Sequence, residues 1–237
     1  MPTGKDIIRR FEELRDQRGT WDAHFQEIAD YGVGRRDFST QVLTKGRKRQ
    51  HQIFDNSFMQ GGEMLSAGLH SLLSNPATRW FRLKLEDDRM MEIEEVAIWV
   101  QLCEQALYRA FNRPEAAFSA SMHEAYTDIV YFGTGGIFIE DAGKRKGAMF
   151  MSAPLSNLYI GEDEKGRLDT YMWTRRMSAR QIVREYGEGV CERADTSIRA
   201  ERFEEEYEIL RAVFPREDPM IRRIGSKHMP WSSYHVE

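Results

Sequence analysis

Apolar residues recur at helical spacing along most of the first half of the chain. Over residues 3–31 this pattern predicts two helices, the first capped by Thr3 and separated from the second by the Gly-Thr pair at 19–20. A longer apolar stretch covers residues 53–74 and contains only two acidic side chains and no Lys or Arg. Its spacing predicts a further helix, which ends before Pro76 because the residue preceding a proline is steered away from helical geometry.

The interior of this predicted helix is rich in small residues: Gly61, Gly62, Ser66, Ala67 and Gly68. Each glycine costs about 1 kcal/mol relative to alanine inside a helix. A helix that keeps such residues usually packs closely against another backbone. We therefore expect this segment to lie against a neighbouring element.

After the proline, Trp80 and Phe81 begin a segment whose composition predicts an extended, half-buried strand. We expect these two rings to anchor the core between helices and sheet. Helices are then predicted over 92–112, with an apolar stripe that includes Ile93 and Leu107 facing inward, and over 115–132. The helical part of the chain ends at three glycines, Gly133, Gly135 and Gly136.

The pattern then changes to short segments rich in β-forming residues, separated by turn signals. These segments are 137–140, 148–151, 158–160, 168–173 and 207–214, with a short helix opened by the capping sequence Ser178 to Gln181. Residues 227–237 begin one more strand, for which the sequence offers no partner. The predicted fold class is α+β: a helical region over 1–132, followed by a mostly antiparallel β-sheet with short helices over 133–237.

Composition narrows the class of protein. The chain is 41% hydrophobic and 30% charged with a formal net charge of −4, which is typical of a globular protein rather than a disordered or membrane chain. No apolar run approaches the roughly 18 residues needed to span a bilayer, and the N-terminus has no signal-peptide pattern. Two reduced thiols, Cys103 and Cys191, are favoured over a disulfide.

The sequence offers little sign of catalytic or metal chemistry. The Gly133–Gly136 loop leaves a helix and opens a strand, the reverse of a phosphate-binding loop, so a helix-ending turn is favoured. No pair of histidines has the spacing of a zinc helix, and Ser71 and Ser74 lie beside no evident base. We therefore predict no catalytic residues, no metal site and no cofactor.

Two charged segments remain as candidate contact sites. The basic run contains Lys45, Arg47, Lys48 and Arg49, and the acidic patch contains Glu86, Asp87, Asp88 and Glu92. The basic run fits contact with DNA phosphates, an exposed linker, or pairing with the acidic patch of a neighbouring subunit. The acids fit a solvated helix start, favoured by the helix dipole, better than a metal site.

Several motifs in order resemble one family. Ile53-Phe-Asp-Asn-Ser57, Leu65-Ser-Ala-Gly-Leu69, Trp80-Phe81, Tyr131-Phe-Gly-Thr-Gly135 and Ala153-Pro-Leu155 appear in sequence along the chain. Their order and spacing resemble the N-terminal region of podovirus head-to-tail connector proteins, the portal family. The similarity extends over nearly the whole chain.

The resemblance implies the wing-like part of a structural subunit. Such subunits form a ring of about twelve at one capsid vertex, through which double-stranded DNA passes without sequence specificity during packaging and ejection. Their implied partners are further copies of the chain, the major capsid and scaffolding proteins, a tail adaptor, and a terminase that supplies the ATP chemistry. The implied location is the virion, after assembly in the host cytoplasm and without a membrane. Stem, clip and crown regions are expected beyond Glu237.

Two other interpretations stay open at this point. The acids near residue 87 suit a metal-dependent nuclease involved in DNA packaging or processing. Alternatively, the helical half suits another capsid or adaptor structural protein, or a helical interaction module unrelated to phage.

Overall fold

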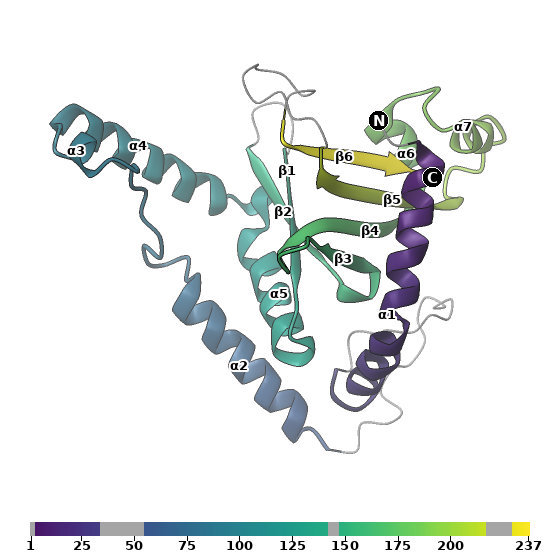
Figure 1. Ribbon diagram of the computed structural model, residues 1–237, viewed down its shortest axis with the longest axis horizontal. Helices are drawn as coiled ribbons and strands as arrows, with labels where there is room; N and C mark the ends of the chain where they lie inside the picture. The colour runs from purple at the N-terminus through teal and green to yellow at the C-terminus, as the bar shows by residue number, and fades with distance from the viewer. Residues whose placement is uncertain (1–2, 34–54, 142–146, 217–228) are drawn as a thin grey trace. The chain divides into compact units, whose positions relative to one another are not determined.

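A computed structural model describes residues 3–33, 55–141, 147–216 and 229–237. The fold is α+β, as predicted from the sequence: long helices come first, and antiparallel strands with short helices follow (Figure 1). Two compact units are present, one made of Met1–Ala23 with Asn157–Glu237 and the other of His24–Ser156. The boundary predicted at residue 132 separates helices from strands. The two compact units do not test it, so it stays a prediction.

The first unit is built on a four-stranded antiparallel sheet. Its strands follow chain order: β3 (Leu158–Glu162), β4 (Leu168–Ser178), β5 (Glu206–Pro215) and β6 (Trp231–Val236). Ile7 and Phe11 of helix α1 (Gly4–Gly32) join Met172 and Leu210 of the sheet in one apolar core. The last strand does have a partner, contrary to the sequence interpretation, because β6 pairs along β5 with Val236 opposite Leu210.

Two short helices, α6 (Ala179–Tyr186) and α7 (Glu192–Arg199), follow β4 and pack together. The predicted capping sequence opens α6, where the Ser178 N–H donates to the Gln181 side-chain oxygen at 2.9 Å.

Helix α1 runs without the break predicted at residues 19–20. A glycine in a helix interior costs only about 1 kcal/mol, which nearby contacts can offset. Arg18 and Asp22 form an ion pair across the expected break, with 2.7 Å between Nε and Oδ1, and Arg18 also donates to the Leu158 carbonyl of β3. The two predicted helices are therefore one.

The second unit consists of helices and a β-hairpin. Its elements are α2 (Ser57–Leu73), α3 (Asp88–Met91), α4 (Glu94–Phe111), a 3-10 turn (Pro114–Ala116), α5 (Phe118–Phe132), β1 (Gly136–Asp141) and β2 (Ala148–Ala153). A second 3-10 turn, Leu155–Asn157, lies where the two units meet in sequence. Among the described residues, the expected antiparallel sheet is thus two separate sheets, because β1 and β2 pair there only with each other.

The glycines after α5 form the predicted turn. Gly133 ends the helix with a φ of 77°, a backbone conformation that suits glycine. A Cβ at Gly135 would lie 2.6 Å from the Ala125 carbonyl oxygen, so the chain passes too close to α5 for a side chain there. Gly136 then opens β1.

The segment after Pro76 is extended, but it forms no strand, so this prediction was wrong. Side chains of α4 satisfy its backbone in place of a neighbouring strand. The Tyr108 hydroxyl bonds both the N–H and the carbonyl of Phe81 at 2.8 Å, and the Leu83 N–H donates to Glu104 Oε2 at 3.3 Å. Local sequence favours an extended chain here, whereas the helix alongside determines its hydrogen-bond partners.

Trp80 packs against the core of the second unit, and Phe81 contacts the Trp80 ring, although both rings are only half-buried. Trp80 stacks almost parallel to Phe118, with 5.6 Å between ring centroids, and Phe81 stacks on Tyr108 at 4.3 Å. Phe150 of β2 belongs to the same cluster. The two rings therefore tie the segment to α4, α5 and the hairpin, and their role as core anchors stays a prediction.

Helix α2 packs on α5 through one of its predicted small residues. A Cβ at Gly62 would lie only 2.1 Å from the Tyr131 hydroxyl oxygen, so no larger residue fits without displacing that ring. The same hydroxyl donates to the Met59 carbonyl at 3.0 Å, and the Phe58 and Tyr131 rings meet edge to face at 5.5 Å. These contacts fix which side of α2 faces inward.

A polar cluster holds the other end of α2 against α5. His70 lies between two hydroxyls, with Nδ1 2.9 Å from Ser74 Oγ and Nε2 2.9 Å from Ser119 Oγ. The Tyr126 hydroxyl donates to Ser74 Oγ at 3.2 Å. The ring of His123, whose Nε2 is 3.9 Å from Glu63 Oε2, lies 6.1 Å from that of His70. Burial, and secondarily the charge of His123, lower the pKa of His70.

Trp80→Ala should lower the free energy of unfolding by about 2–3 kcal/mol. Truncation of a fully buried Trp typically costs about 3–5 kcal/mol, and Trp80 is only half-buried. Trp21→Ala is the matched control: this side chain is 60% exposed, so the change should cost about 0.5 kcal/mol or less. Urea denaturation followed by circular dichroism measures both, and equal costs would contradict the assigned packing of Trp80.

His70→Gln should reduce the pH dependence of stability. Because the folded-state pKa of His70 lies below its ordinary value, the stability given by the neutral ring is present above about pH 6.5 and is lost as the pH falls through the folded-state pKa. The loss of unfolding free energy from about pH 7.5 to about pH 5 should therefore be smaller in this variant than in the unaltered chain. His24→Gln, at an exposed position, serves as the control and should keep the original dependence.

Candidate assembly surface

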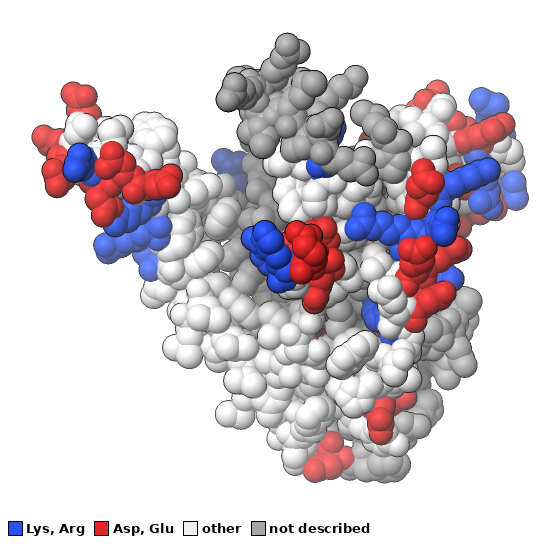
Figure 2. All heavy atoms as spheres, in the orientation of Figure 1, with Lys and Arg blue, Asp and Glu red and all other residues white. Residues whose placement is uncertain are grey.

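The outer side of α2 carries an exposed apolar surface. Met64, Leu65 and Leu72 are each more than half exposed, whereas Gly62 and Ser66, on the side that faces α5, are buried. Phe58 is also more than half exposed but lies at the edge of this surface, where its ring meets Tyr131. Monomeric proteins rarely expose contiguous apolar patches of this extent without a binding role. Figure 2 shows the α2 region as almost free of charged side chains on the visible face.

Helix α4 carries a second exposed apolar surface. On its inner side Val100 and Glu104 are buried, and Glu104 also pairs with Arg79 at 3.7 Å. On its outer side Ile98, Trp99 and Leu102 are 49%, 60% and 54% exposed. The helix is thus apolar on two sides, one of which is buried within its own unit while the other is exposed.

Two residues of the stripe predicted to face inward are in fact exposed: Ile93 at 48% and Leu107 at 37%. The predicted stripe covers a single face of α4 and leaves out the exposed outer face. The signal was present, since apolar residues at 98, 99 and 102 fall between the members of the predicted stripe. Periodicity does not say which of two apolar faces a neighbouring element covers.

The predicted acidic patch lies around α3, at the start of α4. Glu86, Asp87, Asp88 and Glu92 are all exposed, and Figure 2 shows acidic side chains gathered at this end of the two helices. The Asp87 carboxylate caps α3 by accepting from the Arg89 N–H at 3.0 Å, and Asp88 pairs with Lys84 at 2.7 Å. Part of the patch thus has a local structural role. The basic residues Lys45, Arg47, Lys48 and Arg49 lie outside the described residues.

One serine does lie beside a base, contrary to the sequence analysis: Ser74 Oγ is 2.9 Å from His70 Nδ1. A nucleophile must be reached by its substrate, but Ser74 is only 1% exposed. Moreover, the other nitrogen of His70 contacts Ser119. The pair therefore holds α2 to α5 and does not form an active site.

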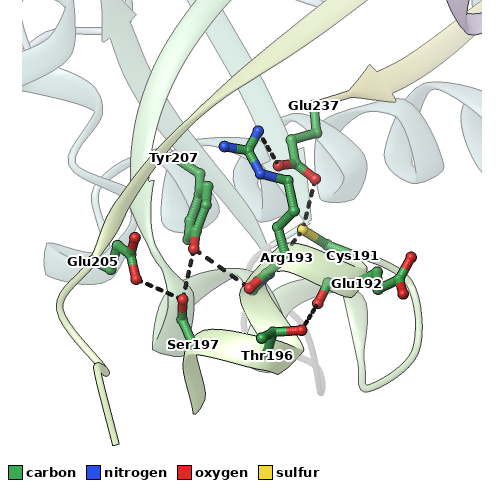
Figure 3. Close-up of polar contacts among 9 residues, drawn as sticks. Cys191, Glu192, Arg193, Thr196, Ser197, Glu205, Tyr207 and Glu237 are labelled. Atoms are coloured by element: carbon green, nitrogen blue, oxygen red, sulfur yellow. Dashed lines mark hydrogen bonds and ion pairs between the residues drawn. The ribbon is translucent and has the colours of Figure 1, made fainter. Parts of the chain in front are cut away.

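A polar cluster of the first unit surrounds α7 (Figure 3). Arg193 pairs with Glu237 at 3.0 Å, and the Cys191 thiol donates to the same carboxylate at 2.9 Å. Ser197 Oγ lies 2.6 Å from Glu205 Oε2 and 2.7 Å from the Tyr207 hydroxyl. These contacts join α7 to β5 and β6.

Burial, and then the hydrogen bond to Glu237, raise the pKa of Cys191, so its thiol stays protonated. Both cysteines are free thiols, as expected. Within the described ranges, no three His, Cys, Asp or Glu side chains are grouped so as to hold a metal ion. No helix of the described part of the chain is long and apolar enough to cross a membrane.

Comparison with known proteins identifies the family. Residues 4–237 match the family described as bacteriophage head to tail connecting protein. The chain is 26% identical over 236 residues to a probable portal protein of Bordetella phage BPP-1, and 23% identical over 236 residues to the portal protein of Salmonella phage epsilon15. Each match covers 98% of this chain but only 42% and 41% of the respective relative. The chain belongs to the family of bacteriophage head to tail connecting proteins.

Proposed function

We propose that this chain is part of a portal subunit, a structural protein that forms a ring with further copies of itself at one capsid vertex. Double-stranded DNA passes through such a ring without sequence specificity during packaging and ejection. The observation that carries this proposal is the pair of exposed apolar faces on α2 and α4, in a chain that belongs to the connector family. A ring subunit needs two different contact surfaces, because each copy meets one neighbour on either side.

The proposed partners follow from the position at a vertex. They are the neighbouring copies, the major capsid and scaffolding proteins, a tail adaptor and a terminase. The protein would reside in the virion after assembly in the host cytoplasm. The chain matches only 41–42% of the length of its relatives, so we assign no residue of it to the DNA tunnel.

We propose a structural rather than an enzymatic role. The acids near residue 87, which suit a nuclease in the sequence alone, cap α3 and pair with Lys84 in the folded chain. Both similar proteins are named as portal proteins, which favours neither a nuclease nor an unrelated capsid or adaptor protein.

The two charged segments are proposed as contacts between copies. The acidic patch is exposed and projects with α3, where a neighbour can reach it. The basic run is its candidate partner on the next copy, with DNA phosphates as the alternative. In either case the run serves contact rather than folding, since exposed ion pairs contribute only about 0–1 kcal/mol.

The full-length protein should form a closed ring. Native mass spectrometry and electron micrographs of purified protein at micromolar concentration would report the subunit number, which we expect to be about twelve. A stable monomer or dimer under these conditions would contradict the proposal.

Replacement of Arg47, Lys48 and Arg49 by Gln should leave the unfolding midpoint unchanged and weaken ring assembly. If the run binds phosphates instead, DNA affinity should fall, and the slope of log affinity against log salt should shrink by up to about 0.9 for each phosphate that the variant no longer neutralises. Replacement of Lys5, Arg9 and Arg15 by Gln on α1, where all three are exposed, provides a control for the removal of three charges. A variant with normal assembly and normal DNA binding would show that the run is a solvated linker.

A further inference from the structure

The outer face of α2 has a regular pattern of large and small residues. Phe58, Leu65 and Leu72 recur every seven residues, and Gly61 and Gly68 lie between them. Such a repeat places all five positions along one side of a helix. We call this set the α2 seam.

The two glycines of the seam have no explanation within the described part of the chain. A Cβ added at Gly61 or Gly68 would meet nothing within 4 Å, unlike one at Gly62, which would strike Tyr131. Glycine weakens a helix interior relative to alanine. At these two glycines, which we call the low points of the seam, no side chain is present, so a second helix can approach closely. Large apolar residues flank each low point.

The outer face of α4 has a different profile. Ile98, Trp99 and Leu102 are exposed along its middle, with Glu95 one turn before them and Arg109 two turns after them. We call this set the α4 ridge. It is apolar in the centre, with a negative charge at its N-terminal end and a positive charge at its C-terminal end.

We propose that the α4 ridge of one copy packs antiparallel on the α2 seam of the next copy. Helices rise about 1.5 Å per residue, so the register of one pair of residues fixes the rest. With Leu102 opposite Leu65, Trp99 meets the low point at Gly68, and the small Ala106 meets Gly61. The bulky Trp99 ring thereby lies over a position without a side chain on the facing helix.

Charge supports the antiparallel direction. Asp55 is exposed just before α2, and in this direction the Arg109 end of the ridge lies beside it. Arg109 also comes opposite Phe58, where a guanidinium can pack on an exposed ring. The parallel direction would instead bring Glu95 to the Asp55 end, and it would leave Trp99 away from Gly68.

A second copy of the chain is the occupant that these features favour. Seam and ridge lie on the same chain, they differ in shape, and they are complementary in size and in charge. A contact between two different surfaces of identical subunits is the kind that closes into a ring. This inference rests on the proposed ring function and names the surfaces that build it.

Disulfide trapping in the full-length protein tests the pairing. In a background with Cys103→Ser and Cys191→Ser, chains that carry both Leu65→Cys and Leu102→Cys should give a ladder of covalent oligomers on mild oxidation. A mixture of the two single variants should give covalent dimers that contain one chain of each kind. Neither single variant alone should cross-link.

The outcomes separate this inference from the ring proposal. Normal rings without cross-links, or cross-links only within one chain, would overturn the seam–ridge contact and leave the ring function standing. Dimers of Leu102→Cys alone would show instead that two α4 helices pair about a twofold axis. Failure to form any ring would contradict both proposals.

A blocking substitution provides a second test. Gly68→Leu fits the folded chain, since a Cβ there meets nothing within 4 Å, but it fills the place proposed for Trp99. It should weaken ring assembly by about tenfold or more without lowering the unfolding midpoint. Gly19→Leu in α1, where a Cβ likewise meets nothing within 4 Å, is the matched control and should assemble normally. Wild-type assembly of Gly68→Leu would overturn the proposal.

Discussion

The close contact between Gly62 and the Tyr131 hydroxyl determines how the second unit presents itself to other molecules. No side chain fits between α2 and α5 at this point, so α2 cannot rotate about its axis without a clash. The hydrogen bond from Tyr131 to the Met59 carbonyl and the polar cluster around His70 fix the same orientation at both ends of the helix. Once the inner side is fixed in this way, Leu65 and Leu72 must face outward.

The consequence is a unit that leaves part of its apolar surface exposed. Helix α5 packs against α2, the hairpin and the ring cluster of Trp80 and Phe118, whereas the outer sides of α2 and α4 stay exposed. Hydrophobic burial stabilises a fold only for surface that leaves water. The remaining surface lowers the free energy when another copy covers it, which is why a ring subunit can keep such faces.

Several polar side chains that resemble catalytic groups make structural contacts in this fold. Ser74 and His70 have the separation of a nucleophile and its base, yet Ser74 is buried between two helices. Cys191 is held by Glu237 and keeps its proton, and Asp87 caps a helix. Residue type and spacing alone do not distinguish these roles. Exposure and the remaining partners of each atom do.

The sequence by itself determined features that depend on neighbouring residues. These are the helix ending at Gly133, the capping of α6 at Ser178 and the α+β order of elements, because caps, positive φ and periodicity act within a few residues. The tertiary structure decided what depends on distant partners. Arg18 with Asp22 and Leu158 carries α1 through Gly19, and Tyr108 replaces a strand partner for Phe81. Likewise, only the packing on α5 shows which apolar face of α2 remains exposed. Both faces have helical spacing, and the sequence does not show which of them another helix covers.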